Sequence, residues 1–180
     1  MIKSPSRTPH PRPDGAAPAR VPEPGPVELA VLRDSAAGRT LWESARTLQV
    51  SYWDARDARH RAVHTLCPGL APPDTTDVAA LPLIRPVTVA VTRGLITADH
   101  VPAPAGGPWT PTGAHQAAGR AVLSDLTNLQ AAQQGTYPLS VLEAALSDLW
   151  QRAASLTRAH LAAVLLLHTP IGTPPWTGAP

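Results

Sequence analysis

The chain has 180 residues and a formal net charge of +2, so it is long enough for one or two domains and is not strongly basic. Its single cysteine, Cys67, excludes an internal disulfide framework and a multi-cysteine zinc site. Phenylalanine is absent and aromatic residues make up only 4%, so a core of Leu, Val and Ala, and hence an all-α fold, is expected.

Proline divides the chain into segments. It alternates with polar residues over positions 1–26, where almost nothing apolar is available for burial. The entropy lost on ordering such a segment would not be offset, so we expect a disordered arm.

The segment that follows this arm has three helical patterns, each with start or stop signals. The first pattern ends at Gly38, because glycine accepts the positive φ of a helix end. Thr40 and Glu43 have the spacing of a capping box, and Ser51 and Asp54 repeat that spacing eleven positions later. The sequence therefore predicts three short capped helices.

Residues 27–67 resemble the LuxR-type helix-turn-helix domain, and more loosely the related region of sigma factors. The resemblance rests on a continuous register of family-like positions: Glu28, Leu29, Val31, Leu32, Ala37, Gly38, Thr40, Glu43, Ala45, Leu48, Val50, Ser51, Arg56, Ala62, Val63 and Leu66. The chain departs from the family at Ser44, where a buried Ile is usual, at Gln49 in place of the turn glycine, and at Ala55 in place of a core Val. The resemblance implies a three-helix unit that binds double-stranded DNA.

The third helix of such a unit is the recognition helix, whose exposed face enters the major groove. Helical spacing from Ser51 turns Ala55, Ala62 and Leu66 inward. The resemblance implies a DNA-binding set that comprises Trp53, Asp54, Arg56, Asp57, Arg59, His60 and Arg61. Arg56 is the principal candidate, because a guanidinium can bind guanine through two hydrogen bonds.

A breaker-rich linker is expected at 68–80, followed by a helical dimerisation or interaction domain at 81–169 and a Pro-rich tail at 170–180. Within the domain at 81–169, apolar and other residues alternate over 87–96 as in a strand. A single strand would lack a pairing partner, so a helix is slightly favoured.

Two long helices are expected in the last third, at 112–134 and from about 138 to 168, folded back as a hairpin. The second has apolar residues at alternating steps of three and four, which is typical of a helix pairing with another surface. We expect a homodimer through Leu142, Leu146, Leu149, Leu156 and Leu167. The apolar run 161–167 is too short to cross a bilayer.

Metal binding is a weaker alternative. His60, His64 and Cys67 share one helical face, but a zinc site requires a fourth ligand. His160 falls at a core position of the apolar stripe, which predicts a core or interface histidine, with a pH-sensitive contact as a second interpretation.

No catalytic site is expected. Asp99, His100 and either Ser124 or Ser140 supply the residue types of a triad, but no nucleophile elbow or oxyanion loop accompanies them. No cofactor is expected. Trp109 and Trp176 lie in proline-rich segments, where each could dock into a partner or fix a loop on its own fold.

These patterns together predict a small, cytoplasmic bacterial DNA-binding regulator with no membrane association. The alternative is a helical protein-interaction protein, from a phage or mobile element, whose three-helix unit binds protein.

Overall fold

The computed structural model describes residues 22–70, 83–104 and 109–172, and all regular structure in these ranges is helical. The predicted all-α class is confirmed. The α-helices in chain order are α1 (Pro26–Ala36), α2 (Leu41–Leu48), α3 (Tyr52–Leu66), α4 (Ile84–Thr92), α5 (Gly113–Leu123), α6 (Asn128–Gln134), α7 (Leu139–Ala153) and α8 (Arg158–His168). The same ranges also contain two short 3-10 turns, η2 (Ala98–His100) and η3 (Pro170–Gly172). The predicted arm up to residue 21, most of the linker, and Trp176 lie outside the described residues.

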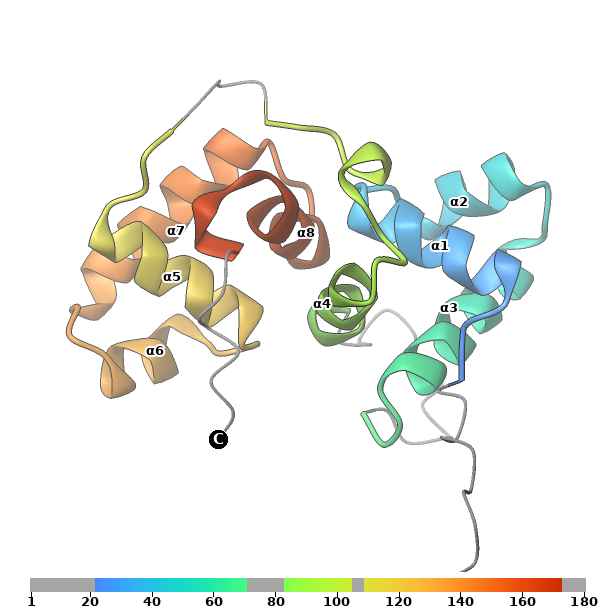
Figure 1. Cartoon of the computed structure of the whole chain (residues 1–180), viewed down its shortest axis with the longest axis horizontal. Helices are drawn as coiled ribbons and strands as arrows, with labels where there is room; N and C mark the ends of the chain where they lie inside the picture. The colour runs from blue at the N-terminus through green and yellow to red at the C-terminus, as the bar shows by residue number, and fades with distance from the viewer. Residues whose placement is uncertain (1–21, 71–82, 105–108, 173–180) are drawn as a thin grey trace, which may run out of the picture.

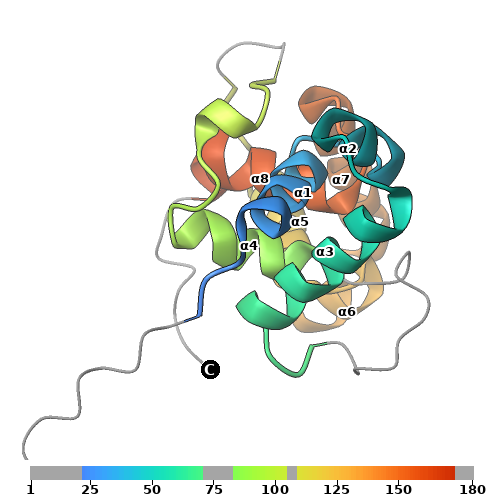
Figure 2. The ribbon, with the colours of Figure 1, turned by 90° about the vertical axis from the view of Figure 1, so that its right-hand side faces the viewer.

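Helix α8 lies in the middle of the molecule, with α4 and α1 on one side and α5 and α7 on the other (Figure 1). Figure 2 turns α1, α2 and α3 toward the viewer and shows α4 beside α3. Every residue of α8 from Ala159 to Leu165 is buried, as expected for a central helix. The apolar run 161–167 therefore belongs largely to the core.

The core continues across the predicted boundary at residues 68–80. Leu32 and Ala36 of α1 are fully buried in one apolar cluster with Val87 of α4, Leu149 of α7 and Leu161 of α8. A second, smaller cluster lies between the first three helices and consists of Val31, Ala45, Ala55 and Ala58. Helix α1 therefore has one face in each cluster and joins the three-helix unit to the rest of the fold.

The segment with strand-like alternation is helical up to Thr92. Ile84, Val87 and Ala90 of α4 are buried, at the spacing of one helix face. The hydroxyl of Thr88 donates to the Ile84 carbonyl at 2.9 Å, so this threonine is satisfied inside a helix. The helical interpretation is confirmed for Ile84–Thr92, because burial against α8 outweighs the β-preference of the valines.

Both long C-terminal helices were predicted wrongly, since each is interrupted. The segment 112–134 forms α5 and α6, separated by a turn in which Asp125 has φ 55°. The segment 138–168 forms α7 and α8, separated at Ala154, with φ 46°. In each case a threonine, Thr127 or Thr157, starts the next helix by accepting a hydrogen bond from a backbone N–H of its first turn.

The C-terminal tail begins inside the core. Ile171 is buried, and a Cβ added at Gly119 of α5 would lie 2.7 Å from its Cγ2 atom. The predicted boundary at 170 therefore cuts through packed structure, and η3 holds α5 and α8 together.

His160 is a buried core histidine, as one of the two interpretations predicted. It lies in the first turn of α8 against Gly38, which follows α1 with φ 84°. Within the described residues neither ring nitrogen has a hydrogen-bond partner. Burial lowers the pKa of His160, because the positively charged ring loses its water.

Acid should destabilise the fold through this residue. In the unfolded chain histidine titrates near pH 6.5, so below that pH the unfolded state binds a proton that the folded state disfavours. The free energy of unfolding is therefore fully retained above pH 6.5 and falls as pH drops, by at most about 1.4 kcal/mol per pH unit from this ring. Urea denaturation between pH 7.5 and pH 5 should show this loss in the wild type. His160→Leu and His160→Gln should both reduce this loss of stability at low pH. An equal loss between pH 7.5 and pH 5 in the wild type and in both variants would show that His160 is not its source.

Candidate nucleic-acid interface

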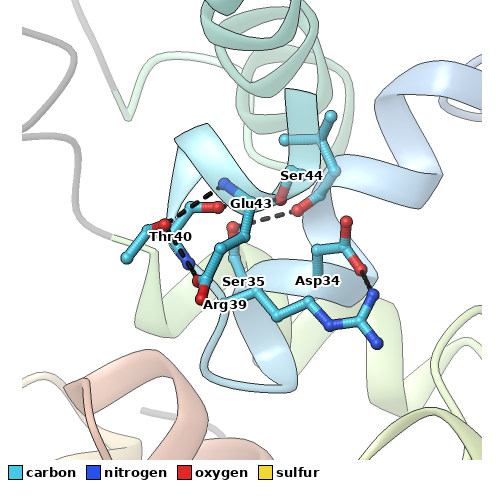
Figure 3. Close-up of polar contacts among 7 residues, drawn as sticks. Asp34, Ser35, Arg39, Thr40, Glu43 and Ser44 are labelled. Atoms are coloured by element: carbon cyan, nitrogen blue, oxygen red, sulfur yellow. Dashed lines mark hydrogen bonds and ion pairs between the residues drawn. The ribbon is translucent and has the colours of Figure 1, made fainter. Parts of the chain in front are cut away.

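Helices α2 and α3 start at the predicted capping boxes, which are confirmed. The Thr40 N–H donates to Glu43 Oε2 at 2.7 Å, and the Glu43 N–H donates to Thr40 Oγ1 at 3.3 Å (Figure 3). The hydrogen bond from the Thr40 N–H holds the pKa of Glu43 below its ordinary value. In the same way, the Ser51 N–H donates to Asp54 Oδ2 at 3.3 Å, and the Asp54 N–H donates to Ser51 Oγ at 3.0 Å. These caps fix where α2 and α3 begin.

The turn between α2 and α3 contains a strained residue. Gln49 has φ 55° and ψ 37°, a left-handed conformation that favours glycine. The next residue closes the turn, since the Val50 N–H donates to the Ala45 carbonyl at 3.0 Å. Gln49 therefore adopts the backbone conformation that the resemblance leads one to expect of a glycine at this position.

Replacing Gln49 with glycine should stabilise the protein. The left-handed strain disappears, partly offset by the greater freedom of glycine in the unfolded chain, so the free energy of unfolding should rise by about 0.5–1 kcal/mol. Urea denaturation measures the change. Gln116→Gly, inside α5, is the matched control and should lower the free energy of unfolding by about 1 kcal/mol. A Gln49→Gly protein less stable than wild type would contradict the strain argument.

The two other departures from the family pattern lie inside the unit. Ser44 is buried, and its hydroxyl donates to the Thr40 carbonyl at 3.1 Å, so the missing apolar volume is replaced by a satisfied polar group (Figure 3). Ala55 is fully buried with Ala45 and Ala58. The interior of the three-helix unit is thus built mainly from small side chains, which brings the helices close together.

The exposed face of α3 contains most of the predicted DNA-binding residues. Trp53 is 62% exposed, and Asp54, Asp57 and Arg61 are also exposed, whereas Arg56 and His60 are half-buried. The buried face of α3 consists of Ala55, Ala58, Ala62, Val63 and Leu66. The three inward residues predicted from spacing are therefore confirmed as buried.

The cations on this face have carboxylate partners. Arg56 Nη2 lies 3.1 Å from Asp57 Oδ1, and its guanidinium lies over the Trp53 ring at 4.8 Å. Arg61 Nε lies 2.7 Å from Glu28 Oε1 of α1. Exposed ion pairs contribute roughly 0–1 kcal/mol, so a base edge can replace Asp57, which is 53% exposed, at small cost. The Glu28 side chain is only 17% exposed, so displacing it from Arg61 costs more.

Arg59 faces a different part of the molecule from the other predicted DNA-binding residues. It is half-buried and lines a recess together with Arg39, Thr40 and Arg158 of α8. Burial lowers the pKa of its guanidinium. Arg59 is thus shared between the three-helix unit and the C-terminal helices.

An exposed aromatic cluster adjoins the exposed face of α3, and the sequence reasoning identified only one of its three members as a surface residue. Trp42 of α2 is 70% exposed and stacks on Tyr52 with ring centroids 4.5 Å apart. Tyr52 meets Trp53 edge to face at 5.4 Å. The sequence did contain a signal that Trp42 is exposed, because Trp42 lies outside the apolar stripe of Leu41, Ala45 and Leu48 on its helix.

The candidate metal ligands do not form a site in the structure. The rings of His60 and His64 are 4.5 Å apart in a T-shaped pair, and Cys67 is buried, which raises the pKa of its thiol. Over the described ranges, no three His, Cys, Asp or Glu side chains are grouped so as to hold a metal ion.

The residues considered for a triad are not brought together, since Ser124 lines a different pocket from Asp99 and His100. His100 Nδ1 lies 2.8 Å from Thr97 Oγ1, and Asp99 and His100 line a pocket with residues of α1 and α2 that include no serine. Trp109 contacts its own fold, edge to face with His115 at 4.9 Å and under the Arg152 guanidinium at 5.1 Å, as the loop-fixing alternative predicted.

The predicted dimerisation residues divide into two groups. Leu142 and Leu149 are each 2% exposed and belong to the core of this chain, so their burial needs no second copy. Leu146 and Leu167 are partly buried, and Leu156, between α7 and α8, is 78% exposed. The interruption at Ala154 separates Leu156 from the stripe of α7.

Comparison with models of protein families, with curated proteins and with solved structures found no match. In the part of the chain that the structure describes, no helix combines the length and apolar character needed to cross a membrane.

Proposed function

We propose that α1, α2 and α3 form a helix-turn-helix that binds double-stranded DNA, with α3 as the recognition helix. The observation that supports this best is the α2-turn-α3 geometry: two capped helices joined through the left-handed residue Gln49, with one face of the first half of α3 exposed. A recognition helix must present that half to the major groove.

In this proposal Arg56 contacts a base edge and Arg61 contacts phosphate, while Asp54 remains occupied by its cap at Ser51. The protein then acts as a small cytoplasmic transcriptional regulator of bacterial type. Binding of the full chain to random duplex DNA in a gel-shift assay tests the proposal. The affinity should fall steeply as salt rises, because cations bound to DNA are released. Absence of binding at low salt would exclude DNA as the partner.

A second candidate is favoured by the aromatic cluster of Trp42, Tyr52 and Trp53. Exposed tryptophans are typical of protein-binding surfaces, where they supply most of the binding energy. In this case α2 and α3 bind a protein. Such an apolar contact should depend weakly on salt, which distinguishes it from binding to a duplex.

Two copies of the chain joined through the C-terminal helices complete the proposed regulator. Leu156 is the member of the predicted set with the most surface available for this contact. Leu156→Glu should convert a dimer into a monomer, measured by size-exclusion chromatography with light scattering. Leu129→Glu is the control, since Leu129 is 55% exposed on α6 and lies outside the predicted set. A wild-type protein that stays monomeric at all concentrations would contradict the dimer.

A further inference from the structure

A recess of about 390 Å³ lies where the three-helix unit meets the C-terminal helices. Its walls come from the α1–α2 corner, α3, the start of α4, the α5–α6 turn and the start of α8. The polar lining residues that matter here are Arg39, Thr40, Arg59, Asp125, Thr157 and Arg158. The volume falls in the range of small-molecule sites, roughly 300–1,000 Å³.

Positive charge dominates the lining. The lining includes three arginines and one carboxylate, that of Asp125. Arg158 uses Nη2 to donate to the Leu126 carbonyl at 3.0 Å, and Arg39 uses Nη1 to donate to Asp34 at 2.8 Å. A guanidinium has five N–H donors in total, so these contacts leave several donors of Arg158 and Arg39 for a ligand.

The start of α8 adds to this charge. Thr157 caps the helix by accepting a hydrogen bond from the His160 N–H at 3.1 Å, and its own hydroxyl proton remains available as a donor. The positive end of the α8 dipole lies at the same place, next to Arg158. The start of α2 contributes less positive charge to the recess, because the Glu43 carboxylate already binds the Thr40 N–H.

We propose that this recess binds a small phosphate-bearing anion. Guanidinium groups match phosphate oxygens with paired hydrogen bonds, and Arg59 of α3 and Arg158 of α8 both line the recess. The recess is walled by several segments, which suits a small molecule. Of the predicted DNA-binding set, Arg59 alone lines the recess, and Arg56 and Arg61, which make the proposed DNA contacts, do not, so the inference stands apart from DNA binding.

Isothermal titration calorimetry of the full chain with inorganic phosphate and inorganic pyrophosphate tests this proposal. We expect saturable binding, and a rise in Tm at saturating ligand because the ligand binds only the folded state. Arg158→Gln and Arg59→Gln should each weaken binding about tenfold or more. Arg158 is exposed, so its variant should fold even if the half-buried Arg59 does not tolerate replacement.

Arg46→Gln is the matched control, because Arg46 is exposed on α2 and is not a lining residue. It should bind both anions as wild type does. Equal binding by Arg158→Gln and Arg46→Gln would overturn the proposal, as would an equal rise in Tm with sodium chloride at matched ionic strength. Displacement of phosphate by duplex DNA would assign the recess to backbone phosphates and would likewise overturn a small-molecule site.

Discussion

Arg56→Ala should bind duplex DNA about tenfold to a hundredfold more weakly than the wild type in a gel-shift assay. A bidentate contact from arginine to a base edge contributes roughly 1–3 kcal/mol, and each 1.4 kcal/mol is a factor of ten. In the free protein Arg56 is paired with exposed Asp57, so little is lost when the guanidinium turns to DNA.

Three variants make this result specific. Arg56→Lys keeps the charge without the paired donors, so it should recover only part of the affinity. Arg120→Ala, on the exposed side of α5, removes the same charge away from α3 and should bind as wild type does. Asp57→Asn should bind more tightly, because it removes a carboxylate from the face that meets the polyanion. Equal losses in Arg56→Ala and Arg120→Ala would contradict a specific role for α3.

Gly38→Ala should lower the free energy of unfolding by roughly 2–4 kcal/mol, a large part of the total for a small domain. Gly38 has φ 84°, which an alanine adopts only with strain. A Cβ there would also lie 2.6 Å from Nδ1 of His160 and 3.1 Å from its Cγ, so the imidazole or the end of α1 must move. Urea denaturation at pH 7.5, where His160 is neutral, measures the loss.

Gly94→Ala separates the two causes. Gly94 has φ 71°, and nothing lies within 4 Å of an added Cβ, so only backbone strain applies and the loss should be about 1 kcal/mol. The double variant Gly38→Ala, His160→Ala should be more stable than the sum of the single losses predicts, since the clash is then absent. Strict additivity would show that the ring and Gly38 do not interact.

Local signals in the sequence predicted the first three helices well. Thr40 with Glu43, and Ser51 with Asp54, form hydrogen bonds within four residues of chain, so their spacing alone identifies them. The left-handed turn at Gln49 was indicated only by the resemblance to a family with glycine there.

The interruption before α6 did have such a signal, because Thr127 and Gln130 have the capping-box spacing and make its hydrogen bonds, and the prediction of one helix overlooked it. The interruption at Ala154 is followed by a capping threonine, Thr157, without a capping box. Asp125 and Ala154 adopt positive φ without being glycine, so no glycine in the sequence marked the ends of α5 and α7. The apolar stripe of 138–168 continues through Ala154, so periodicity predicted one helix where there are two.

The surroundings of Arg59 also could not be predicted from α3 alone. Helical spacing placed it beside the inward face, but the recess that it lines is completed by Thr157 and Arg158, about a hundred residues later in the chain. No local pattern indicates which distant helix covers a given side chain.

The two faces of α1 have a consequence for how this chain can be rearranged. Many recombined proteins arise by exchanging modules whose cores are self-contained. Here Leu32 and Ala36 would be exposed to solvent if α1, α2 and α3 were separated from α8. The apolar cluster that would remain, around Val31 and Ala45, is small. The three-helix unit is therefore not a portable module: a graft onto another protein would need a substitute for α8, and changes in either half of the chain are constrained by the other.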